Sequence, residues 1–127
     1  MMALSEEFLL YLEDLFCVVP ETVMRRMFGG IGIFRHGLMY ALATSEGMVA
    51  FKVDDETVEG FEAAGAQEWV YVNRSGKTMR MGYWYVPEAV LEDRDALKSW
   101  ALEAFGAAKR ADDRKPASER KYSPVAL

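Results

Sequence analysis

The chain has 127 residues, of which 51% are hydrophobic and 28% charged. This length is typical of a single domain, and the composition excludes both wholesale disorder and, because no apolar run approaches ~18 residues, a membrane-spanning helix. Residues 1–108 carry a net charge of −8 and residues 109–127 a net charge of +3, so we expect the first 108 residues to repel a phosphate backbone and not to bind nucleic acid directly.

The first predicted element is a helix that begins after Ser5 and ends before Pro20. Ser5 is a favourable N-cap, and the large apolar residues after it recur with helical period. Residues 24–53 then read as three short strands, because glycine and serine at 36–37 and 44–47 favour tight turns. Three glycines inside the first of these strands indicate a bulge or a close backbone approach.

A second helix is predicted to begin at Asp54 or Asp55 and to end at Gly65, since glycine suits the left-handed conformation at a helix C-terminus. Two further strands follow, at 69–73 and 78–86. The strand 78–86 carries apolar residues on both faces, so we expect it to lie inside the sheet and to be covered on both sides.

The last predicted helix begins at Asp93 and has the most regular apolar stripe of the chain. From Lys109 onward the sequence is charged and contains prolines, which predicts a disordered tail over 109–127 behind a single domain over 1–108. The order α-β-β-β-α-β-β-α, with short turns between strands, predicts an α+β fold with a mainly antiparallel five-stranded sheet.

The sequence gives little indication of a metal or catalytic centre. Cys17 and His36 are the single cysteine and histidine, too few for the usual zinc or copper sites, and neither has a recognisable catalytic partner. We therefore expect no cofactor, no metal and no enzymatic activity. A single cysteine precludes an intrachain disulfide, and the N-terminus lacks the basic residues of a signal peptide, which together favour the cytoplasm.

Five segments resemble, in order and spacing, the TfoX N-terminal domain family. They are RRMFGGIGIF (25–34), GLMYAL (37–42), FKVDDET (51–57), MGYW (81–84) and VPEAVLED (86–93). The resemblance implies a bacterial cytoplasmic α+β domain similar to secretion chaperones and the YjbR group. In the best-known members a second, helical domain is attached, and the protein regulates natural competence together with the cyclic-AMP receptor protein. We expect a single-domain member, and the resemblance supplies no catalytic residues.

Candidate binding residues come from two segments of the chain. Adjacent arginines on a strand point to opposite faces, so one is expected to form an ion pair while the other contacts solvent or a partner. The glycines of FGGIGIF lack the third glycine of a dinucleotide fingerprint, and a strand follows them instead of a helix. The candidates for ligand or partner binding are Arg25, Arg26, Met27, Phe28, Gly29, Gly30, Tyr83 and Tyr85.

Two functions fit these residues. The leading one is a non-enzymatic regulatory module that binds a protein partner or forms a homodimer, because three helices cover about one face of a five-stranded sheet. The alternative is a sensor that holds an anionic or aromatic small molecule between Arg25 or Arg26 and the Tyr83–Tyr85 strand. A sensor predicts an enclosed pocket lined by converging polar groups, whereas a protein-binding module predicts an exposed apolar patch.

Overall fold

The computed structural model describes residues 5–27 and 29–124, so the candidate Phe28 lies outside the described residues. The elements are, in chain order, α1 (Glu6–Phe16), β1 (Thr22–Met27), β2 (Gly30–Arg35), β3 (Leu38–Ala43), β4 (Val49–Lys52), α2 (Val58–Ala63), β5 (Glu68–Val72), β6 (Thr78–Tyr85), α3 (Glu88–Leu91), α4 (Arg94–Asp113) and the 3₁₀ turn η1 (Ala117–Glu119). Two of the three predicted helix starts are confirmed: the Ser5 hydroxyl accepts a hydrogen bond from the backbone of α1, and the Asp93 carboxylate accepts two from α4. The predicted start of the second helix at Asp54 or Asp55 was wrong, because residues 55–57 form a turn and α2 begins at Val58.

The strands form one antiparallel sheet in the order β1-β2-β3-β4-β6-β5. The predicted mixed helix-and-strand fold and the antiparallel pairing are confirmed, but the sheet has six strands and the prediction of five was wrong. The segment predicted as the first strand is a hairpin in which Met27 pairs with Gly30 and Gly29 has φ of 77°. Glycine adopts this left-handed conformation without strain, so the chain reverses inside an apolar run that carries no polar turn signal.

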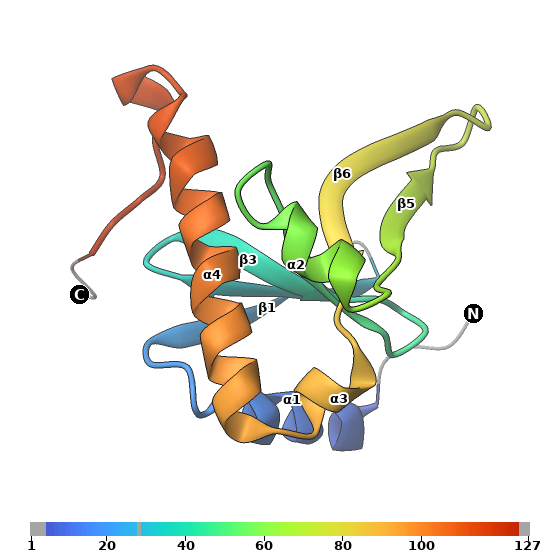
Figure 1. Cartoon of the computed structure of the whole chain (residues 1–127). Coiled ribbons are helices and arrows are strands. Elements are labelled where there is room, and N and C mark those ends of the chain that lie inside the picture. Colours follow the sequence, from blue (N-terminus) through green and yellow to red (C-terminus); the bar gives the residue numbers. More distant parts are fainter. Residues whose placement is uncertain (1–4, 28, 125–127) are drawn as a thin grey trace.

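The main hydrophobic core cluster lies on one face of the sheet. Ala41, Phe51 and Trp84 are cross-strand neighbours on β3, β4 and β6 and therefore share this face. The Phe16 ring of α1 packs edge-on against Phe51, with centroids 6.2 Å apart, and α2 packs Phe61 against Trp84. Figure 1 shows α4 crossing this face over β3. The buried apolar residues of α4 are Leu97, Ala101, Ala104, Ala107 and Ala108.

Strand β6 lies inside the sheet, as predicted, between β4 and β5. Its pairing with β4 is confined to residues 83–85, so residues 78–81 continue with β5 as a hairpin that extends away from the helices and the rest of the sheet (Figure 1). The prediction that β6 is covered on both sides therefore fails for its first half, where Met81 is 46% exposed.

The end of the chain differs from the predicted disordered tail. The carboxylate of Asp112, on the last turn of α4, accepts hydrogen bonds from the backbone N–H groups of Lys121 (2.9 Å) and Tyr122 (3.1 Å). The Tyr122 ring packs edge-on against His36, in the turn between β2 and β3. Together with the hydrogen bond from the Ser123 N–H to the His36 carbonyl (2.8 Å), these contacts hold the segment against the domain, although its composition is that of a solvated tail.

Candidate functional site

The two candidate arginines lie on β1, an edge strand of the sheet. The Arg25 guanidinium stacks over the Phe34 ring, 4.9 Å from its centroid, on the face opposite the helical core. Arg26 is exposed and points to the other side of β1. Within residues 5–27 and 29–124 neither arginine takes part in an ion pair, so the prediction of an ion pair for one of them was wrong and both charges are available to an outside partner.

The glycine-rich segment supports strand packing. A methyl group added to Gly30 would overlap the backbone carbonyl of Ala43 on β3, so the third strand leaves room only for a glycine here. A methyl group at Gly29 would meet open space, and that glycine serves the turn. The predicted close backbone approach is confirmed at Gly30. No helix follows this turn, since β2 continues directly into β3, and the geometry of a phosphate cradle is absent from it.

A cavity of about 580 Å³ opens between α1 and β1. Its lining residues are Leu9, Glu13, Phe16, Cys17, Val19, Pro20, Glu21, Thr22, Met24, Arg25, Arg26 and Ile31. The buried side chains of Phe16, Val19 and Ile31 form its apolar floor, and Glu13, Glu21 and Arg26 are exposed at its rim. The cavity brings both candidate arginines together with α1, which had no place among the sequence candidates.

The two candidate tyrosines lie elsewhere. Tyr83 is buried on β6, donates a hydrogen bond from its hydroxyl to the Met39 carbonyl (3.2 Å), and lies beneath Lys52, whose Nζ is 5.2 Å from the ring centroid. Burial raises the pKa of the Tyr83 hydroxyl and lowers the pKa of Lys52. Tyr85 lines a second cavity of about 430 Å³ beside Gly65, and burial together with the Glu46 charge raises its pKa.

The arginines and the tyrosines do not form one site. Strands β2, β3 and β4 separate β1 from β6 in the sheet. Four strand spacings correspond to about 19 Å, more than a small molecule spans. Met27 lies near Arg25, because its sulfur is close to Gly32 on the face of the sheet that carries Arg25 and Phe34.

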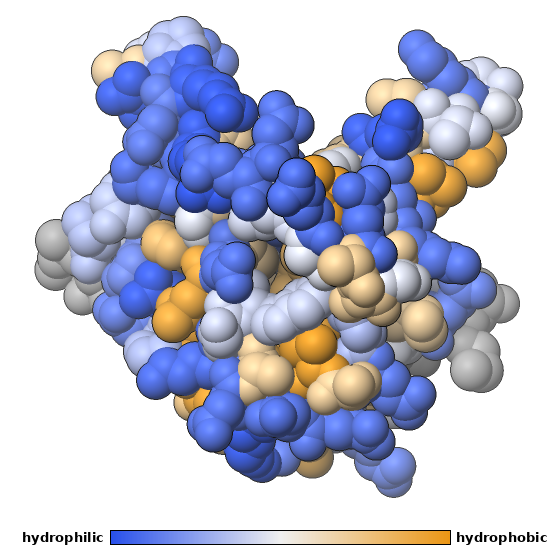
Figure 2. Space-filling view, viewed as in Figure 1, coloured by the Kyte–Doolittle hydropathy of each residue, from blue (hydrophilic) through white to orange (hydrophobic). Residues whose placement is uncertain are grey.

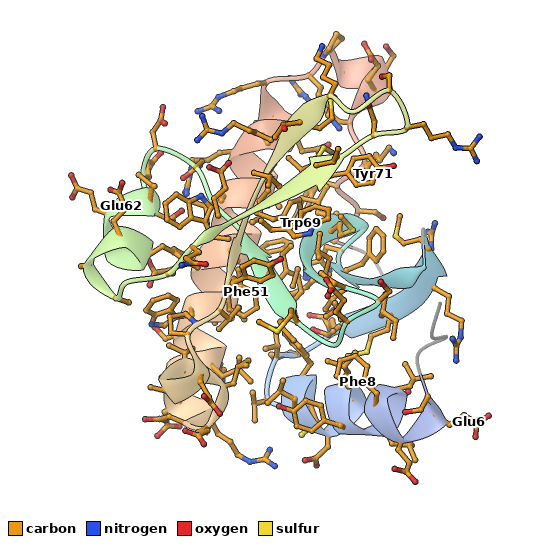
Figure 3. All side chains as sticks on the ribbon, turned by 90° about the vertical axis from the view of Figure 1, so that its right-hand side faces the viewer. Glu6, Phe8, Phe51, Glu62, Trp69 and Tyr71 are labelled. Carbon is orange, nitrogen blue, oxygen red and sulfur yellow. The ribbon has the colours of Figure 1, made fainter. Side chains whose placement is uncertain are left out.

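Exposed apolar side chains gather on the β5–β6 hairpin. Val70 is 45% exposed, Tyr71 48%, Val72 58% and Met81 46%; these four residues are called the hairpin surface below. In Figure 2 hydrophobic atoms appear along the projecting arm on the right. Trp69 anchors the base of the hairpin, with its ring 6.4 Å from the Tyr71 ring, and both project from β5 in Figure 3.

Sequence reasoning missed the hairpin surface and the α1 side of the cavity. Residues 69–73 are predicted correctly as a strand, but nothing in an apolar pentapeptide distinguishes an edge strand from a central one. The polar turn at residues 73–77 was the available signal, because a polar turn indicates that the tip of the hairpin lies in solvent.

Three further properties of the described residues concern metal binding, the cysteine thiol and membrane insertion. No group of three or more His, Cys, Asp and Glu side chains in this part of the chain is arranged to hold a metal ion. The exposed Cys17 thiol accepts a long hydrogen bond from Arg94 (3.6 Å), which also pairs with Asp14. Among the described helices, none combines the length and the apolar character that crossing a membrane requires.

Comparison with protein families gives the identity of the domain. Residues 14–108 match the family model of the TfoX N-terminal domain. The chain belongs to the TfoX N-terminal domain family. The matched region runs from the end of α1 to the middle of α4 and includes the complete sheet. The comparison with curated proteins found no match.

Proposed function

We propose that this TfoX N-terminal domain protein is a cytoplasmic, non-enzymatic regulatory module that acts by binding proteins, with a second copy of itself as one partner. The observation that supports this proposal is the hairpin surface. Ten large hydrophobic side chains are exposed in the described residues, and four of them lie on this one hairpin. Val70 and Val72 lie on one face of this projecting hairpin and Tyr71 on the other. Exposed apolar side chains on a projecting arm are typical of a protein-interaction site.

Strand β5 also supports pairing with a second copy. It is an edge strand, so one side of its backbone is free to add a further strand. In an antiparallel pair of β5 strands centred on Tyr71, Val70 lies opposite Val72. Apolar groups then meet apolar groups, which favours a two-fold homodimer.

The alternative of a small-molecule sensor has weaker support. It requires Arg25 or Arg26 to share a pocket with Tyr83 or Tyr85, and these residues belong to strands at opposite sides of β2, β3 and β4. The buried hydroxyl of Tyr83 is already used by the Met39 carbonyl.

Sedimentation velocity over a concentration range of about 5–200 µM tests the proposal. We expect the wild-type mass to rise toward twice the chain mass of 14.4 kDa. The double variant Tyr71→Thr/Val72→Thr keeps the strand propensity while removing apolar surface, and should remain monomeric. Leu10→Gln is the matched control, because Leu10 is exposed on α1, away from the hairpin. A wild-type protein that stays monomeric, and that captures the same proteins from host extract as the double variant, would contradict the proposal.

A further inference from the structure

The second edge of the sheet, β1, has an open backbone. Within residues 5–27 and 29–124, the backbone hydrogen bonds of β1 go to β2 alone. In an antiparallel pair every second residue directs its N–H and C=O groups away from the partner strand. These groups of β1 therefore form a row of donors and acceptors that another extended chain can use.

A helix runs beside this open edge. Helix α1 lies below β1 in both Figure 1 and Figure 3, and the cavity of about 580 Å³ lies between them. An edge strand next to a helix makes a groove in which a peptide adds to the sheet and directs alternate side chains toward the helix. The apolar floor formed by Phe16, Val19 and Ile31 suits aliphatic side chains at those alternate positions.

The charge on the opposite face of β1 favours acidic residues in the occupant. Four charged residues line the cavity, namely Arg25, Arg26, Glu13 and Glu21. Glu21 is already partnered, since its carboxylate lies 3.4 Å from His36 Nε2 and 3.9 Å from the Arg35 guanidinium. On the cavity side the Arg26 charge is therefore balanced by Glu13, whereas the Arg25 guanidinium, stacked on Phe34 on the opposite face of β1, has no acidic partner within residues 5–27 and 29–124.

We propose that the groove between α1 and β1 binds an extended segment of a partner protein that alternates aliphatic and acidic residues and adds to β1 as a further strand. Backbone hydrogen bonds to β1 supply affinity. The aliphatic side chains enter the cavity, and the alternating carboxylates lie on the opposite face of the added strand, where one of them pairs with Arg25. This site lies at the opposite edge of the sheet from β5, so it does not depend on the hairpin surface.

Fluorescence anisotropy with a fluorescein-labelled peptide tests the site. The probe is an eight-residue peptide that alternates valine and glutamate, compared with a valine–lysine peptide and with a valine–glutamate peptide whose central amides are N-methylated. We expect saturable binding of the first peptide and at least about tenfold weaker binding of both others, because they lose the charge pair or the backbone hydrogen bonds.

Two charge reversals locate the peptide. Arg25→Glu should weaken the valine–glutamate peptide by about tenfold and strengthen the valine–lysine peptide. Lys98→Glu on α4, an equal charge change at an exposed position away from the cavity, should leave both affinities within about twofold. The bound peptide should also slow the reaction of the Cys17 thiol with Ellman's reagent, because Cys17 is exposed and lines the cavity.

The hairpin variant separates this proposal from the proposed function. Tyr71→Thr/Val72→Thr should bind the valine–glutamate peptide as wild type does, even if it no longer dimerises. Loss of peptide binding in that variant would place the peptide on β5 and overturn the groove. Equal binding of all three peptides, no saturation up to about 1 mM, or an unprotected Cys17 thiol would overturn it as well.

Discussion

Replacing Gly30 by alanine distinguishes a packing role of the glycine-rich segment from a binding role. Gly30 is the first residue of β2, and its Cα faces the carbonyl oxygen of Ala43 on β3. A methyl group there meets backbone that is fixed in the sheet. The two strands have to separate by ~1 Å to restore an ordinary carbon–oxygen contact.

The destabilisation expected for Gly30→Ala depends on the fact that the methyl group meets backbone atoms. Overpacking of a core costs ~1–3 kcal/mol, and a backbone wall cannot move aside as a side chain does, so ~2–3 kcal/mol is expected for Gly30→Ala. Alanine also lowers the conformational entropy of the unfolded chain, which stabilises the folded state by ~0.5 kcal/mol. With ~2 kcal/mol net, and ~4 °C per kcal/mol for a chain of this size, Tm should fall by ~8 °C.

Thermal unfolding followed by circular dichroism at pH 7 measures this shift. Gly32→Ala is the control, because the added methyl group there meets the side chains of Met27, Phe34 and Met39. The two methionines are flexible, so the loss should be smaller. If Gly30→Ala melts within about 2 °C of wild type while Gly32→Ala loses more, the backbone-wall reasoning is wrong.

Two further predictions concern buried polar groups. Thr22→Val leaves the buried Tyr40 hydroxyl without the 2.8 Å hydrogen bond that it now makes, and should lower the free energy of unfolding by ~1–2 kcal/mol in urea titrations, whereas adding Tyr40→Phe should recover most of that loss. The hydrogen bond from the backbone N–H of Lys121 is the main cause that lowers the pKa of Asp112. The stability that this contact contributes is therefore complete above the pKa of the unfolded chain, about 3.9, and is lost as the pH falls through the lower pKa of the folded state. Hydrogen exchange should therefore show the Lys121 and Tyr122 amides losing protection below about pH 4, and an Asp112→Asn variant lacking that pH step would support the assignment.

The sequence by itself determined the class of the fold and most of its elements. Helical periodicity and capping residues placed α1 and α4, and turn residues placed four of the strand boundaries, because both signals act within a few residues. Five short segments in order were enough to indicate the TfoX N-terminal domain family, and the family model over residues 14–108 confirms it. The hairpin at Gly29 was not predicted, because its only sequence signal, a pair of glycines, is equally typical of a β-bulge.

The tertiary structure decided which of the candidate residues lie together. Arg25 and Arg26 lie together on the edge strand β1, beside the cavity that it forms with α1, whereas Tyr83 and Tyr85 lie beyond three intervening strands. Strand order depends on pairings between segments that are far apart in the chain, and no local pattern encodes them. The exposure of the β5–β6 hairpin has the same origin: β4 pairs with β6 only over residues 83–85, and the rest of the hairpin is left without a neighbour.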